Sequence, residues 1–261
     1  MDLLIVTGPL GSGKTTAVNR LLRESLDCGY RVALLVNEFG ETSVDGALLL
    51  PYQNELEGIA NLVNGCACCS LRSDLIRVLE GWAALPEGQR PERVVLETTG
   101  LADPTDLVDL EHDVRLRGRL QLRGVLTVLS CLVPTEELLV DLVLRHQITL
   151  ASTLYLSKGD VDAEAESRWF TRMKEEFPMV SVFRARHGVP ETSATDPWAG
   201  DALSRLRDPM AVTNLTSFGS ARSFTLRWDH PIDPLKLESL LKSPPAGGRL
   251  LRAKGICRFA D

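Results

Sequence analysis

The chain has 261 residues, of which 29 are Lys or Arg and 35 are Asp or Glu, so its formal net charge is −6. Its 44% of apolar and 25% of charged residues are typical of a globular protein, and its length suits one large domain or one domain with a smaller annex. The acidic balance argues against nonspecific nucleic-acid binding and a polybasic membrane anchor, and no apolar run reaches the roughly 18 residues that span a bilayer.

Short apolar runs rich in β-branched residues alternate with helical stretches along most of the chain. Strands are predicted at 3–7, 32–37, 94–97, 125–129, 153–157 and 180–184, and helices at 14–27, 70–84, 134–146 and 162–176. Most strand runs are continuously apolar, as in strands that are covered on both faces. The alternation predicts an α/β fold, a three-layer sandwich around a mostly parallel sheet.

The first strand leads into the segment Gly8–Thr15, which matches the pattern G-x-x-x-x-G-K-[ST] and opens a helix. Glycines allow backbone N–H groups to turn toward phosphate oxygens, and the helix N-terminus adds its positive end. We expect Lys14 to contact the β and γ phosphates and Thr15 to bind Mg²⁺. This predicts a P-loop NTPase with nucleotide contacts from Gly8, Gly11, Ser12, Gly13, Lys14, Thr15 and Thr16. The apolar start of the chain leads directly into this loop and is therefore no secretory signal, so we expect a cytoplasmic protein.

An acidic loop follows the second predicted strand. It contains Glu38, Glu41 and Asp45, between the phosphate loop and a group of cysteines. In a nucleotide switch protein, the loop that senses the γ-phosphate occupies this place. We expect one of these carboxylates to complete a metal site, to approach Mg²⁺ or to orient the attacking water, with Glu38 as the catalytic candidate.

Three of the six cysteines, Cys66, Cys68 and Cys69, fall within four positions just before a predicted helix. A helix N-terminus lowers the pKa of nearby thiols, and thiolates favour Zn²⁺ and similar ions. Tetrahedral Zn²⁺ takes four ligands, so three cysteines leave one position open, for which Glu41 is our candidate. An open position suits a transient metal carrier, whereas buried small apolar residues or a redox-active thiol loop are the alternatives.

Glu97 ends the third predicted strand and precedes Thr98-Thr99-Gly100. An acidic residue at the tip of a strand beside a phosphate loop can hold the Mg²⁺ water shell, and a glycine lets a backbone N–H approach the γ-phosphate. We therefore predict that Glu97 and Thr15 hold Mg²⁺, that Glu97 is catalytic together with Lys14, and that Gly100 contacts the nucleotide.

The segment Ser157-Lys158-Gly159-Asp160 follows the fifth predicted strand and resembles the guanine-reading motif N-K-x-D of G proteins, with Ser in place of Asn. A carboxylate at Asp160 accepts hydrogen bonds from guanine N1–H and the N2 amino group, whereas adenine offers a lone pair at N1 and no N2 amino group. The stem of Lys158 can lie across the base plane. We predict that Ser157, Lys158 and Asp160 bind the base and select GTP.

The pattern changes after about residue 212. Ser223–Trp228 alternates like an exposed strand, and Pro234–Leu241 predicts a short helix with Asp233 as its N-cap. A strand, a helix and one more strand near Leu250–Lys254 bury too little surface to fold alone. We expect a P-loop domain over 1–212 and a short, incomplete α+β segment over 213–261.

With these motifs in this order, the sequence resembles the CobW-like metallochaperone GTPases, which are related to the nickel-insertion GTPases of urease and hydrogenase. The resemblance is carried by 8–16, 36–41, 64–72, 97–104 and 157–160, and 250–255 resembles a signature of the family's second domain. It implies slow GTP hydrolysis with Mg²⁺, coupled to the handling of Zn²⁺, or of Co²⁺ or Ni²⁺, by the C-x-C-C thiols. It also implies a client metalloprotein as partner and allows a homodimer.

Two other functions are compatible with the same residues. An ATP-dependent kinase of small molecules would share the phosphate loop, prefer ATP and use the cysteines structurally. A zinc-binding module that holds nucleotide without turnover would bind metal independently of the nucleotide.

Overall fold

The computed structural model describes residues 1–38, 58–63, 70–191, 196–199, 231–242 and 259. Its central element is a sheet in which eight described strands lie in the order β3-β2-β4-β1-β5-β6-β7-β8. The strands are β1 Asp2–Thr7, β2 Val32–Glu38, β3 Gly58–Val63, β4 Arg93–Glu97, β5 Gln121–Ser130, β6 Thr153–Ser157, β7 Ser181–Arg186 and β8 Val189–Pro190. Pairs among β1 to β7 are parallel, and only the short β8 runs antiparallel to its neighbour. The mostly parallel sheet confirms the predicted α/β fold.

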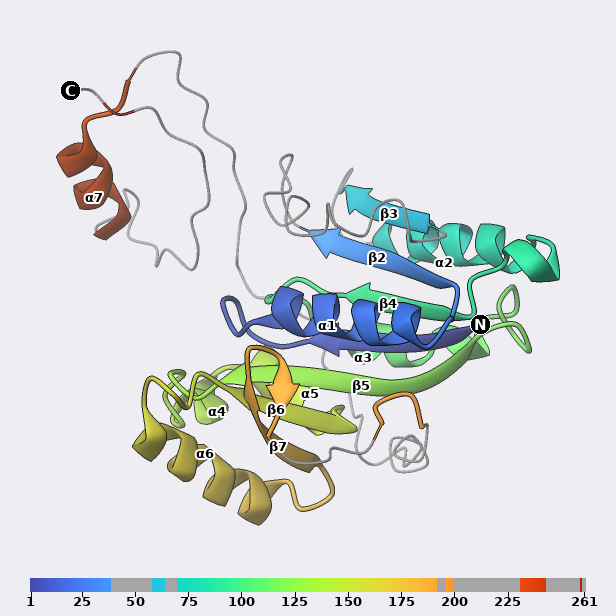
Figure 1. The fold of residues 1–261 in the computed structure, drawn as a ribbon. Coiled ribbons are helices and arrows are strands. Elements are labelled where there is room, and N and C mark those ends of the chain that lie inside the picture. Colours follow the sequence, from blue (N-terminus) through green and yellow to red (C-terminus); the bar gives the residue numbers. More distant parts are fainter. Residues whose placement is uncertain (39–57, 64–69, 192–195, 200–230, 243–258, 260–261) are drawn as a thin grey trace.

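Helices cover both faces of this sheet (Figure 1). They are α1 Lys14–Asp27, α2 Ser70–Ala83, α3 Thr105–Val108, α4 Glu137–Val140, α5 Leu142–Thr149 and α6 Ala163–Glu176, with short 3-10 turns at Glu87–Gln89 and Leu110–His112. A further helix, α7 Pro234–Lys242, belongs to the C-terminal segment. None of the helices in these ranges is long and apolar enough to cross a bilayer.

Alternate residues of β1 divide the core between the two faces. Leu4 and Val6 pack against α1 through Val18 and Leu22, whereas Leu3 and Ile5 pack with residues of α2 and α3. Side chains that alternate along a strand point to opposite faces, so the fully buried run of β1 supplies both halves of the core. Further along the sheet, α5 and α6 cover β5 and β6 on the face opposite α1, and the fully buried Trp169 is the largest side chain of that cluster.

The chain reverses its direction of travel across the sheet at β1. From β1 it passes through α1 to β2 on one side, whereas β5, β6 and β7 follow in order on the other side. In such sheets the crevice at the carboxyl ends of the strands around the reversal binds ligands. The phosphate loop, the Glu97 turn and the 157–160 loop all leave strands at this edge.

Three local expectations need correction. The predicted helix 134–146 is two helices, because the side chain of Asp141 accepts a hydrogen bond from Leu144 N at 3.0 Å and starts α5 afresh. Strand β3 was not expected, and it pairs with β2 as the edge strand. The hairpin β7–β8 was also missed: His187 (φ 48°) and Gly188 (φ 78°) form its two-residue turn, in which both residues take positive φ.

The described part of the C-terminal segment is small. Helix α7 confirms the predicted helix there, and Asp233 Oδ1 accepts a hydrogen bond from Lys236 N at 3.4 Å, as expected of its N-cap. Ile232 and Phe259 form an isolated parallel bridge. The predicted strands at 223–228 and 250–254 lie outside the described residues, and the domain boundary at 212 remains a prediction.

Candidate nucleotide site

The phosphate loop lies between β1 and α1 and takes the backbone shape that anion binding requires. Gly8, Gly11 and Gly13 have φ of 135°, 72° and 99°, in the region that L side chains rarely enter. At Gly8 a Cβ would lie 2.0 Å from Val128 O, so only glycine fits there. Helix α1 has no side-chain cap and no acidic residue in its first turn, so its N-terminal N–H groups are available to phosphate oxygens.

Lys14 lies within this loop and is buried. Its Nζ donates to Gly8 O at 2.9 Å and to Pro9 O at 3.1 Å. The ammonium therefore already points into the concave side of the loop, and phosphate oxygens can replace the two carbonyl acceptors.

The Mg²⁺ ligands that the sequence predicts are in contact. Thr15 Oγ1 donates to Glu97 Oε1 at 2.9 Å, although 82 positions separate the two residues. The contact arises because β4 lies beside β1 in parallel register, with Glu97 opposite Val6. A hydroxyl and a largely buried carboxylate are oxygen ligands of the kind that Mg²⁺ prefers, so these side chains fit the ion.

The turn after β4 packs directly on the phosphate loop. A Cβ at Gly100 would lie 2.4 Å from Leu10 N and 2.7 Å from Leu10 Cα, so the two backbones touch. From the other side, the fully buried Gln147 of α5 donates through Nε2 to Ala102 O at 3.0 Å and to Gly100 O at 3.4 Å. Gly100 is thus held between the phosphate loop and α5.

A second contact from α5 reaches the same turn. His146 Nδ1 and Asp103 Oδ2 are 2.6 Å apart, and Asp103 also accepts a hydrogen bond from Thr105 N at 2.9 Å. The first half of the turn is fixed to β1, because Thr98 N donates to Val6 O at 3.0 Å. The sequence did not identify α5 as a support of this turn.

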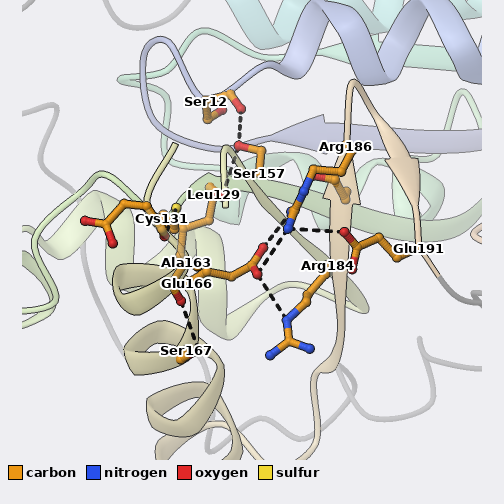
Figure 2. A network of polar contacts seen from close by, with 12 residues as sticks. Ser12, Leu129, Cys131, Ser157, Ala163, Glu166, Ser167, Arg184, Arg186 and Glu191 are labelled. Atoms are coloured by element: carbon orange, nitrogen blue, oxygen red, sulfur yellow. Dashed lines mark hydrogen bonds and ion pairs between the residues drawn. The ribbon is translucent and has the colours of Figure 1, made fainter. Parts of the chain in front are cut away.

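The predicted base-reading loop is hydrogen-bonded to the phosphate loop. Ser157 Oγ lies 2.7 Å from Ser12 O and 3.3 Å from Leu129 O, so its hydroxyl links the end of β6 to the loop before α1 (Figure 2). Lys158 has φ of 63°, which places the loop in a tight left-handed turn. The serine that departs from N-K-x-D therefore joins the two loops.

The buried carboxylate of Glu166 in helix α6 packs against the base-reading loop. A Cβ at Gly159 would lie 1.9 Å from Glu166 Oε1. Arg186 of β7 forks onto this carboxylate, with Nη1 2.6 Å from Oε1 and Nη2 3.2 Å from Oε2, and Arg184 Nε lies 3.2 Å from Oε2 (Figure 2). The sequence analysis did not predict a role for Glu166.

Of the remaining predicted site residues, Asp160 is exposed at the end of the base-reading loop. Glu38 ends β2, whose carboxyl end lies at the same edge of the sheet as Glu97. Glu41, Asp45, Cys66, Cys68 and Cys69 lie outside the described residues. Among the residues that are described, no group of three or more His, Cys, Asp or Glu side chains could hold a metal ion.

Two families match this chain. Residues 2–181 match the family described as "CobW/HypB/UreG, nucleotide-binding domain", and residues 221–261 match "Cobalamin synthesis protein cobW C-terminal domain". The first match covers the whole of the phosphate loop, the Glu97 turn and the base-reading loop.

Several curated proteins are similar in sequence, among them two zinc chaperones and a zinc-regulated GTPase metalloprotein activator. The zinc chaperone YjiA of Escherichia coli is 34% identical over 97% of this chain and 80% of its own length. The zinc chaperone CobW of a Sinorhizobium species is 36% identical over 48% of this chain, and the zinc-regulated GTPase metalloprotein activator 1 of Saccharomyces cerevisiae is 32% identical over 49%. These two alignments span 35% and 30% of the relatives' own lengths.

Solved structures support the fold. Zn(II)-bound YjiA GTPase from Escherichia coli aligns with a TM-score of 0.52 at 20% identity, covering 93% of this chain and 76% of that one. HypB from Helicobacter pylori in complex with nickel aligns with a TM-score of 0.50 at 17% identity, covering 78% and 84%. With the family match over 2–181, the conclusion is that this chain belongs to the CobW/HypB/UreG family of P-loop nucleotide-binding proteins.

Proposed function

We propose that this chain is a GTP-hydrolysing metallochaperone that carries Zn²⁺, or a related divalent metal, and delivers it to a client metalloprotein. The observation that carries the nucleotide part is the junction of three predicted elements: Thr15 contacts Glu97, and Ser157 contacts the phosphate loop at Ser12. The metal part is supported by the C-x-C-C segment and by relatives that are named zinc chaperones.

The phosphate side of the site binds and orients the triphosphate. Backbone N–H groups of the loop and of the start of α1 receive the phosphate oxygens, and Lys14 exchanges its two carbonyl acceptors for the β and γ phosphates. Thr15 and Glu97 would hold Mg²⁺, which supplies positive charge to the phosphate oxygens when bound. Glu38, at the end of β2, is our candidate for orienting the attacking water.

The base side selects guanine. The carboxylate of Asp160 accepts from guanine N1–H and the N2 amino group, and adenine presents a lone pair where the first donor is needed. A site built for such hydrogen bonds rejects the mismatched base by a factor on the order of 10⁴. Lys158 lies across the base plane, and Ser157 keeps this loop in register with the phosphate loop.

The metal is cargo in this proposal. The ligands are the thiolates of Cys66, Cys68 and Cys69, and Glu41 completes the set. Metal binding depends on the nucleotide because the acidic loop that carries Glu41 follows β2, beside the proposed position of the γ-phosphate. By linkage, a metal that prefers one nucleotide state changes nucleotide affinity by the same coupling free energy, typically about 1–3 kcal/mol. Hydrolysis then changes metal affinity and releases the ion to the client.

Hydrolysis assays with and without Zn²⁺ test the proposal. We expect slow hydrolysis of GTP and none of ATP, loss of activity in Lys14→Ala, and a Zn²⁺ effect in the wild type that disappears in Cys68→Ala. Cys28→Ser, an exposed cysteine outside the motif, is the matched control and should keep the Zn²⁺ effect. Turnover of ATP with phosphate transfer to a small acceptor would favour a kinase, and no hydrolysis with nucleotide-independent metal binding would favour a storage module.

A further inference from the structure

Glu166 is a buried carboxylate that the proposed function does not use. Only 5% of its side chain is exposed, and three nitrogen contacts from Arg184 and Arg186 surround it (Figure 2). A charge in such a place is costly unless it is paired and hydrogen-bonded, and removing one member of the pair leaves the other uncompensated. The pairing with Arg186 is a two-point fork, which fixes the direction of both side chains.

The base-reading loop passes directly over this ion pair. At Gly159 a Cβ would lie 1.9 Å from Glu166 Oε1 and 2.2 Å from its Cδ, so the carboxylate packs directly against the backbone of the loop. Asp160, the predicted guanine-reading residue, comes next in the chain. The residue after the contact with Glu166 is therefore a second, exposed carboxylate.

Arg186 has several acidic neighbours. The pKa of Arg186 is raised, first by its hydrogen bond to Glu166, against the opposing effect of desolvation, and then by the negative charges of Glu166, Glu191 and Asp160. Glu191 Oε1 lies 3.1 Å from Arg186 Nη2. Arg186 is therefore shared among acidic groups, and its fork is occupied by Glu166 and Glu191 rather than by Asp160.

Reading guanine requires that the acceptor oxygens of Asp160 are free. An arginine that bridged to this carboxylate would occupy the lone pairs that guanine N1–H and the N2 amino group need. We propose that Glu166 is a positioning residue for guanine selectivity: by holding the Arg186 fork beneath Gly159, it keeps that arginine away from Asp160. The inference rests on the proposed reading of GTP by Asp160.

Competition binding with GTP and ATP tests this role in the full chain. Glu166→Gln keeps the size of the side chain but removes the buried charge onto which Arg186 forks, while the contact of Arg186 with Glu191 stays. We expect GTP affinity to fall about tenfold, the loss of roughly one charged hydrogen bond, while ATP affinity is unchanged. In the double variant Glu166→Gln/Arg186→Gln the competing cation is gone, and the ratio of GTP to ATP affinity should return to within about threefold of the wild type, a difference of less than 1 kcal/mol.

Glu176→Gln is the matched control, because it removes another carboxylate of α6 that pairs with an arginine, Arg172, at 2.6 Å on the surface. It should leave the ratio unchanged. Should Glu166→Gln not fold, as judged by urea unfolding, Glu166→Asp takes its place: it keeps the charge but is too short for the fork, so the ratio should fall and recover in the same way with Arg186→Gln.

Two results would overturn the inference: a wild-type ratio in Glu166→Gln, or a double variant no better than the single one. Equal binding of GTP and ATP by the wild-type protein would instead refute the proposed guanine selectivity itself. The two failures are therefore distinguishable in one set of titrations.

Discussion

Replacing Gly100 by Ala should separate the two backbones that meet at the phosphate loop. The new methyl group would lie 2.4 Å from Leu10 N and 2.7 Å from Leu10 Cα, and these main-chain atoms cannot rotate away as a side chain can. Ordinary van der Waals contact begins near 3.4 Å, so the turn after β4 and the phosphate loop must move apart by about 1 Å. Overpacking of this kind destabilises a fold by about 1–3 kcal/mol.

The same movement should also affect the chemistry. A misplacement of about 1 Å among groups that position a substrate can lower the rate about 10²-fold. Urea unfolding measures the first effect, and GTP hydrolysis per folded molecule measures the second. Gly88→Ala is the control, because a Cβ there meets nothing within 4 Å. Wild-type stability and activity in Gly100→Ala would refute the close contact between these two segments.

Three further predictions concern buried groups around the site. Ser157→Ala removes the hydroxyl that links the two loops. It should lower the free energy of unfolding by about 1 kcal/mol and the affinity for GTP severalfold, and Ser157→Thr should restore both. Gln147→Leu leaves two buried carbonyls of the β4–α3 turn without their donor and should cost about 1–3 kcal/mol in urea unfolding; an unchanged midpoint would contradict that role. Burial raises the pKa of Cys131, so its thiolate is scarce at pH 7–8; peptide mapping after alkylation should find the exposed Cys28 modified and Cys131 unmodified until pH is raised or the protein unfolds.

The regular elements near the phosphate loop could be predicted from the sequence because their signals are local. Helix α1 runs over 14–27 as expected, since a glycine-rich loop precedes it and Gly29 with positive φ follows it. Strand β6 has the predicted bounds, since Thr153–Ser157 is a short apolar run bordered by polar turns. The turns that carry the predicted binding residues can therefore be located from the sequence.

The supports of the site could not be predicted in this way, because they come from segments far apart in the chain. Gln147 reads as an ordinary polar residue of a helix, and only the packing of α5 beside β4 gives its side chain two carbonyls to bind. Glu166 reads as a solvated helix residue, and only β7 supplies the two arginines that allow its burial. The division of the helix at Asp141 depends on a single side-chain cap, which competes with an otherwise continuous helical pattern.

We propose that the binding of nucleotide and the binding of metal by this chain influence each other. Coupling is measured by titrating Zn²⁺ into the 261-residue chain loaded with GDP or with a non-hydrolysable GTP analogue, and into a Cys66→Ala/Cys68→Ala/Cys69→Ala variant as the blank. We expect Zn²⁺ dissociation constants that differ about 5- to 150-fold between the two nucleotide states, with an equal change in nucleotide affinity when Zn²⁺ is present. Equal Zn²⁺ affinity in both states, with metal still bound by the three cysteines, would contradict it.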